Sequence, residues 1–129
     1  MFRYPYKLAT VGSPPAPFVL LNLAALGSDN WETNVAALAD TGADVTVILD
    51  SIVQALGLVA LDSLPTMGLG GEVTRRKTYG VRLVIRDLPA VEIEVVGSAD
   101  WKYAILGRDV LNRYRVVFDG PNQRLEIGP

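Results

Sequence analysis

The segment Asp40-Thr41-Gly42-Ala43-Asp44 has the clearest capacity for chemistry in this chain. It lies between two apolar runs, so Asp40 is expected to enter a folded interior, where an ionised carboxylate is costly unless it has a partner. Thr41 can form local hydrogen bonds, and Gly42 permits a turn that a residue with a Cβ would resist. The segment would then hold a carboxylate rigidly at the floor of a cleft. A plain surface turn between two strands is the alternative, because the same residue types are common in turns.

The residue types that the chain lacks narrow the chemistry further. It has no histidine and no cysteine, which removes imidazole bases, thiol nucleophiles and the commonest zinc ligands. Hydrolysis by carboxylates, by serine with lysine, or by a carboxylate-bound metal remains. No Ser-x-x-Lys or Gly-x-Ser-x-Gly motif is present, and the acids near Asp40 do not alternate as in a calcium loop. We therefore expect carboxylate chemistry with no metal and no cofactor.

Most of the chain has the short apolar alternation that is typical of β-strands. Strands are expected at 18–24, 35–39, 45–49 and twice or three times within 72–96, with a final hairpin of 115–118 and 123–127. Two short helices are expected, at 51–56 and at 109–114. For the first, Asp50 and Ser51 offer an N-cap and Gly57 lies where a C-cap should be. This pattern predicts an all-β closed barrel over residues 17–129. Residues 1–16, which end in a Pro-rich break, are expected to be a flexible N-terminal arm outside the core.

Length and charge set further limits. A chain of 129 residues is expected to form one domain, and half of its residues are hydrophobic, which leaves apolar surface for a dimer interface. The net charge of -2 gives no electrostatic basis for binding nucleic acid or an anionic membrane. Without an apolar N-terminal run, a long apolar segment or cysteine, the chain is expected to be cytoplasmic.

Three segments, in order, resemble those of the retropepsin-like aspartic proteases. Ala37 to Asp44 resembles their active-site segment, Met67 to Val73 their Gly-rich flap, and Ala104 to Leu111 the apolar segment with Gly-Arg that leads into their C-terminal helix. The resemblance covers about residues 17–127. It implies the closed acid-protease barrel of the retropepsin type, with one or two short helices, as the single-lobe protomer of a homodimer. The chain carries one Asp-Thr-Gly, and aspartic proteolysis needs two carboxylates that share a proton, so a second copy must supply the other.

The resemblance also implies a role for each site residue. Asp40 would be catalytic, Thr41 would bond across the two-fold axis, and Gly42 and Ala43 would complete the loop. Asp44 would form a partly buried ion pair with Arg108, of the kind that costs about 3–5 kcal/mol when one partner is lost. The flap would consist of Met67, Gly68, Leu69, Gly70 and Gly71. The substrate-binding residues would be Val47, Trp101, Tyr103 and Ile105.

The expected function is that of an aspartic endopeptidase that hydrolyses peptide bonds between apolar residues by general acid/base activation of water. One alternative is a catalytically silent retropepsin fold that serves as a dimerisation or peptide-binding module. Another is an unrelated β-barrel in which Asp40 is structural. Compared with retroviral enzymes, this chain continues further beyond Arg108 and ends in its own hairpin. In retroviral enzymes interleaved chain ends hold the dimer, and this hairpin is expected either to replace that arrangement or to weaken it. The dimer is then expected to be looser, or to form only with substrate.

Overall fold

The structure is a computed structural model that describes all residues, 1–129. Two short helices, α1 (Asp50–Ala55) and α2 (Arg108–Leu111), accompany ten strands. The strands are β1 (Phe2–Pro5), β2 (Phe18–Ala25), β3 (Trp31–Ala39), β4 (Val47–Leu49), β5 (Asp62–Met67), β6 (Val73–Val84), β7 (Val91–Ser98), β8 (Ala104–Leu106), β9 (Arg115–Asp119) and β10 (Arg124–Gly128). Neither helix has the length and apolar character needed to span a bilayer.

The larger sheet closes into a barrel. Its strand order is β2-β3-β8-β4-β7-β6-β5, and β2 also pairs with β6, which closes the barrel and leaves β5 paired with β6 alone. The side chains that alternate inward from these strands form the core, in which Leu21, Leu23, Ile48, Leu83 and Leu106 are fully buried. The all-β closed barrel predicted from the alternation is confirmed.

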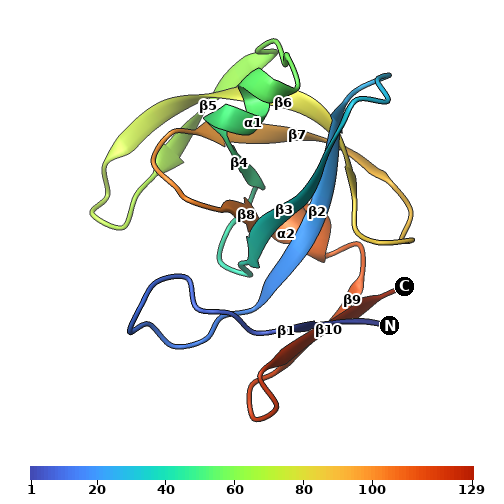
Figure 1. Cartoon of the computed structure of the whole chain (residues 1–129). Coiled ribbons are helices and arrows are strands. Elements are labelled where there is room, and N and C mark those ends of the chain that lie inside the picture. The colour runs from blue at the N-terminus through green and yellow to red at the C-terminus, as the bar shows by residue number, and fades with distance from the viewer.

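Strand β8 lies between β3 and β4, and this arrangement positions the loop that contains Asp40. β3 and β8 are parallel, with Ala39 opposite Leu106, and Val47 of β4 pairs with Ile105 on the other side of β8. The chain from 40 to 46 must therefore pass around the end of β8 to reach β4. Figure 1 shows this loop beside the short β4 and β8 strands, with the β5–β6 hairpin extending beyond the barrel.

A second sheet, of order β1-β10-β9, joins the two ends of the chain. β1 pairs antiparallel with β10, and Figure 1 places the N- and C-termini side by side. The C-terminal hairpin was predicted, but the expectation that all of residues 1–16 lies outside the core is wrong for its first strand. Tyr4 is only 7% exposed and belongs to the main hydrophobic cluster, because β10 supplies the partner that lets this short segment form a strand.

The two helices differ slightly from the sequence prediction. α1 begins one residue earlier than expected, and neither Asp50 nor Ser51 caps it: its N-cap is Leu49, with no side-chain hydrogen bond. It also ends one residue earlier than expected, at Ala55, and its C-cap is Leu56. Gly57 directly follows with a φ of 63°, its N–H donates to the Gln54 carbonyl, and the Leu58 N–H donates to the Val53 carbonyl. α2 is shorter than the predicted 109–114.

Candidate active site

Backbone hydrogen bonds fix Asp40 in the loop after β3, and one of them reaches its carboxylate. The Asp40 N–H donates to the Leu106 carbonyl at 3.0 Å, which ties the loop to β8. The Gly42 N–H donates to Asp40 Oδ1 at 2.8 Å, and the Ala43 N–H donates to the Asp40 carbonyl at 3.2 Å. No other hydrogen bond to this carboxylate forms within the chain, so Oδ2 remains available to a ligand.

Glycine at position 42 has a different role from the one expected. Its φ is not in the left-handed region, so the backbone conformation itself would accept other residues. A Cβ added at Gly42 would instead lie 3.2 Å from Asp40 Oδ1, which is tighter than most contacts of a real Cβ atom. The absence of a side chain therefore lets the N–H of residue 42 approach the carboxylate.

Arg108 connects α2 to three points of the Asp40 loop. Its Nη1 donates to the Thr41 carbonyl at 2.7 Å, its Nη2 pairs with Asp44 Oδ1, and its backbone N–H donates to the Ala43 carbonyl at 2.9 Å. The predicted Asp44–Arg108 pair is thus present, but it is not partly buried as expected, since the Asp44 side chain is 82% exposed. The cost expected for breaking a buried pair does not apply to it.

A second support of the loop, from Thr46 and Asp109, was not predicted. Thr46 is fully buried, and both its N–H and its hydroxyl donate to the Asp109 carboxylate, at 3.0 and 2.7 Å. The same hydroxyl accepts the Gly107 N–H at 3.1 Å. A Cβ at Gly107 would lie 2.7 Å from the Val45 carbonyl group, so the two segments touch backbone to backbone. The only sequence signal for the contact between Thr46 and Asp109 was the presence of an acid directly after Gly107-Arg108.

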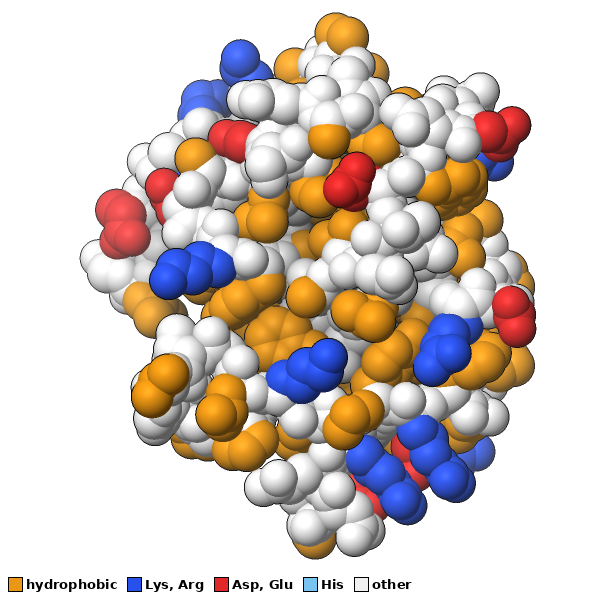
Figure 2. All heavy atoms as spheres, viewed as in Figure 1, with side chains coloured by type: hydrophobic (Ala, Val, Ile, Leu, Met, Phe, Trp, Pro, Cys, Tyr) orange, Lys and Arg blue, Asp and Glu red, His pale blue; other side chains and the backbone are white.

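Asp40 lies on the wall of a cleft of about 820 Å³ between this loop, the β5–β6 hairpin and the segment before β8. The predicted residues that line the cleft are Asp40, Gly42, Ala43, Val47, Met67, Gly68, Leu69, Gly70, Trp101 and Ile105. Further lining residues, not predicted, are Thr66, Glu72, Thr74, Arg76, Val96, Ser98 and Asp100. Figure 2 shows hydrophobic side chains gathered where the middle of this face is hollowed, with charged side chains around them.

The predicted flap is the tip of the β5–β6 hairpin. Met67 pairs with Val73, and the tip is closed by hydrogen bonds from the Gly68 N–H to the Glu72 carbonyl and from the Gly71 N–H to the Gly68 carbonyl, both 3.0 Å. Gly71 has a φ of 82°, a conformation that glycine adopts readily. Leu69 at the tip is fully exposed, so this apolar side chain has no partner within the protomer.

Five predicted site residues do not line the cleft: Thr41, Asp44, Gly71, Tyr103 and Arg108. Arg108 binds the loop from outside the cleft, and Asp44 is one of the loop residues that it contacts. The ring of Tyr103 packs edge-on against Phe18, with centroids 5.1 Å apart, and lies 6.1 Å from the Trp101 ring. Tyr103 therefore supports the position of Trp101 and does not face the cleft.

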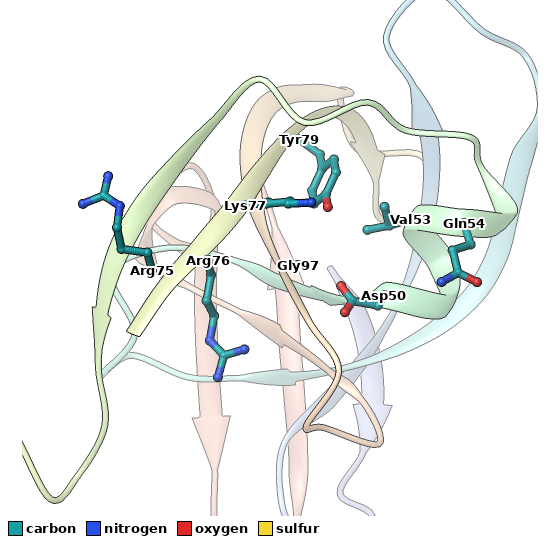
Figure 3. Close-up of a pocket in the computed structure, with 8 residues that line it drawn as sticks. All are labelled: Asp50, Val53, Gln54, Arg75, Arg76, Lys77, Tyr79 and Gly97. Carbon is teal, nitrogen blue, oxygen red and sulfur yellow. The ribbon is translucent and has the colours of Figure 1, made fainter. Parts of the chain in front are cut away.

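A smaller pocket of about 350 Å³ lies between α1, β6 and β7. Figure 3 shows the Asp50 carboxylate, Lys77 and Tyr79 around it, while the Arg75 side chain points away. It shares only Arg76 with the cleft and contains none of the predicted site residues. The chemistry expected from the sequence therefore belongs to the larger cleft.

Together, the closed barrel, the Asp-Thr-Gly loop beside β8 and the Gly-rich hairpin over the cleft define a retropepsin-type fold. The family model for retroviral aspartyl protease matches residues 17–118, and the chain belongs to this family. No curated protein sequence matches it.

Two solved structures have the same fold. The EIAV protease, in complex with an inhibitor, has a TM-score of 0.62 at 20% identity over 81% of this chain and 92% of its own. A retropepsin-like aspartic protease from Rickettsia conorii has a TM-score of 0.55 at 16% identity over 97% of this chain and 98% of its own. At this identity the comparison shows the shared fold.

Proposed function

We propose that this chain is an aspartic endopeptidase whose active site forms from Asp40 of two copies in a homodimer. The observation that supports this most directly is the Asp40 carboxylate itself, which lines the cleft with Oδ1 bound to the Gly42 N–H and Oδ2 unbound within the chain. One protomer offers a single such carboxylate. Acid/base hydrolysis by aspartates needs two that share one proton, so the site is incomplete without the second copy.

In the proposed dimer, the two carboxylates take opposite roles. The ionised Asp40 accepts a proton from a water molecule, which attacks the scissile carbonyl carbon. The protonated Asp40 of the partner subunit donates its proton to the carbonyl oxygen, which gives a neutral gem-diol. Proton transfer to the leaving nitrogen and cleavage of the C–N bond complete the reaction, and no covalent acyl-enzyme forms.

The surroundings of Asp40 fit a peptide substrate. Val47, Ile105 and Trp101 give the cleft an apolar lining, which favours apolar residues on both sides of the scissile bond. The Gly-rich tip at 68–71 would close over the bound peptide and exclude water, with Leu69 covering it. Thr41 is held only through its carbonyl, which leaves its exposed hydroxyl free to bond across the two-fold axis.

The proposed dimer cannot be held by β10. This strand is already paired on both sides, by β1 and β9, so its backbone has no free edge for a second copy. The exposed apolar side chains near the cleft, Met67, Leu69, Val73 and Trp101, instead offer surface for a contact around the Asp40 loops. An interface of this kind lacks the shared sheet that interleaved chain ends would add. We therefore expect the dimer to be stabilised by bound substrate.

The test is cleavage of a broad peptide library between about pH 4 and 7, where carboxylate pairs are active. Wild type is compared with Asp40→Asn, with pepstatin inhibition as a second criterion, and sedimentation reports assembly under the same conditions. Asp87→Asn, an exposed acid in the β6–β7 turn, is the matched control and should cleave as wild type does.

Cleavage between apolar residues by wild type and Asp87→Asn, but not by Asp40→Asn, is the expected result. A dimer that binds peptides without turnover would replace the proposal with the peptide-binding module. Equal cleavage by wild type and Asp40→Asn would exclude Asp40 as the catalytic group.

A further inference from the structure

Among the charged side chains that line the cleft, acids outnumber bases. They are Asp40, Glu72, Arg76 and Asp100. Arg76 Nη2 lies 2.7 Å from Asp100 Oδ2, so these two side chains neutralise one another. The two charges that remain, on Asp40 and Glu72, belong to carboxylates, and Glu72 has no role in the proposed chemistry.

Glu72 is held against the tip of the hairpin in a specific way. Its carbonyl accepts the Gly68 N–H at 3.0 Å, and its side chain folds back over the turn. A Cβ on Gly68 would overlap the Glu72 carboxylate, and one on Gly70 would lie 2.8 Å from Glu72 Oε2. Glycine at both positions therefore leaves space for the carboxylate at the tip, in addition to any flexibility that it gives.

The Glu72 carboxylate has no partner in the protein. It takes part in no ion pair and its side chain accepts no hydrogen bond, although Arg75 and Arg76 follow on β6. Arg75 binds Ser63 and Arg76 binds Asp100, so both nearby guanidinium groups are already engaged. An unpaired carboxylate on the wall of a peptide-sized cleft is positioned to bind a cation brought by the ligand.

We infer that Glu72 selects substrates with a lysine or arginine close to the scissile bond, a specificity that rests on the proposed endopeptidase function. Glu72 and Asp40 line the same cleft, and three residues of extended peptide span about 10 Å, so we place the basic residue within about three positions of the cleaved bond. In the two-fold dimer each flap contributes one Glu72. The selected peptides thus combine apolar residues at the cleaved bond with a basic residue on either side.

The test uses matched peptides that share an apolar centre and carry lysine, glutamine or glutamate at each of the three positions on either side. For wild type, kcat/KM is expected to be about tenfold higher for the best lysine peptide than for its glutamate counterpart, the scale of one charge-assisted contact. The ratio should shrink as salt is raised, because Glu72 is exposed to solvent. In Glu72→Gln the ratio should fall to within about twofold, whereas Glu94→Gln, an exposed acid on β7, should keep the wild-type ratio.

The outcomes separate this inference from the proposed function. Cleavage with the same charge ratio in wild type and Glu72→Gln, or a preference for glutamate, would overturn the inference and leave the endopeptidase in place. If no peptide is cleaved, the inference is tested by binding. The same peptides, each carrying a fluorescent label, are titrated with the protein and binding is measured by fluorescence anisotropy. A lysine preference that Glu72→Gln abolishes would then support the specificity, and binding without charge preference would refute it.

Discussion

Replacing Arg108 tests which of its contacts holds the Asp40 loop. The guanidinium bridges two acceptors, the Thr41 carbonyl and the Asp44 carboxylate. A lysine ammonium cannot replace the planar fork that reaches both at once. Arg108→Lys should therefore loosen the loop at Thr41, next to Asp40, whereas Asp44→Asn should leave that bond in place.

The expected loss of folding stability in each variant follows from the solvent exposure of the side chains involved. The Asp44 side chain is 82% exposed and that of Arg108 is 42% exposed, so solvent screening limits the ion pair to about 0.2–1 kcal/mol. A hydrogen bond from a charged donor to a carbonyl contributes about 1.5–3 kcal/mol, which partial exposure reduces to about 1–2 here. Arg108→Lys should thus destabilise the fold by about 1–2 kcal/mol and Asp44→Asn by less than about 1.

Urea denaturation of the two variants, with peptide cleavage measured in parallel, checks this order. At 129 residues, one kcal/mol corresponds to about 4 °C in Tm, so thermal melting also resolves the difference. The larger effect on cleavage is also expected for Arg108→Lys. A loss of stability in Asp44→Asn equal to or greater than that in Arg108→Lys would refute the reasoning, because the ion pair and not the Thr41 carbonyl would then carry the stabilisation.

Three further substitutions test other features of the fold. Gly107→Ala places a Cβ 2.7 Å from backbone atoms and should lower stability by more than about 2 kcal/mol in denaturation, whereas Gly120→Ala, with open space around it, should be far milder. Thr46→Val leaves the buried Gly107 N–H without its hydroxyl acceptor and should lower the free energy of unfolding by about 2–3 kcal/mol. A near-neutral result would exclude a stabilising role for this hydroxyl. Hydrogen bonds from Asn122 lower the pKa of Asp119 from its ordinary value of 3.8, and the bond from the Asn122 side chain contributes more than the bond from its backbone N–H. This carboxylate thus stabilises the fold above the unfolded-state pKa, and the contribution is lost as pH falls through the lower folded-state pKa. Asn122→Ala should raise the pKa of Asp119 in an NMR titration, and an unchanged value would contradict the assignment.

The parts of the fold that were predictable depend on short-range patterns. Val81 and Leu83 lie on either side of Arg82 at the alternation of a strand, and both are fully buried on β6. The end of α1 followed from Gly57, because a left-handed C-cap is a local property of the chain. The Asp40 loop and the Gly-rich tip of the β5–β6 hairpin could be located because the residue types within each segment resemble those of the family.

The features that could not be predicted depend on contacts between distant segments. Thr46 meets Asp109 only because the loop passes around β8, and neither residue has a local pattern that indicates the contact. β1 becomes a strand because β10 is beside it, and a four-residue segment ending in proline gives a weak strand signal by itself. Tyr103 was placed in the cleft by its resemblance to a substrate-binding position of the family, but its ring packs against that of Phe18.

The position of β8 between β3 and β4 also affects the order in which the domain can fold. As the chain is synthesised, residues 40–46 emerge long before Ala104 to Asp109, which supply the partner strand and the side chains that hold that loop. Non-local pairings of this kind form late, because loop closure must precede them. The Asp40 loop can therefore reach its final shape only after β8 and α2 have left the ribosome, so a nascent chain that ends before them has the acid but not its support.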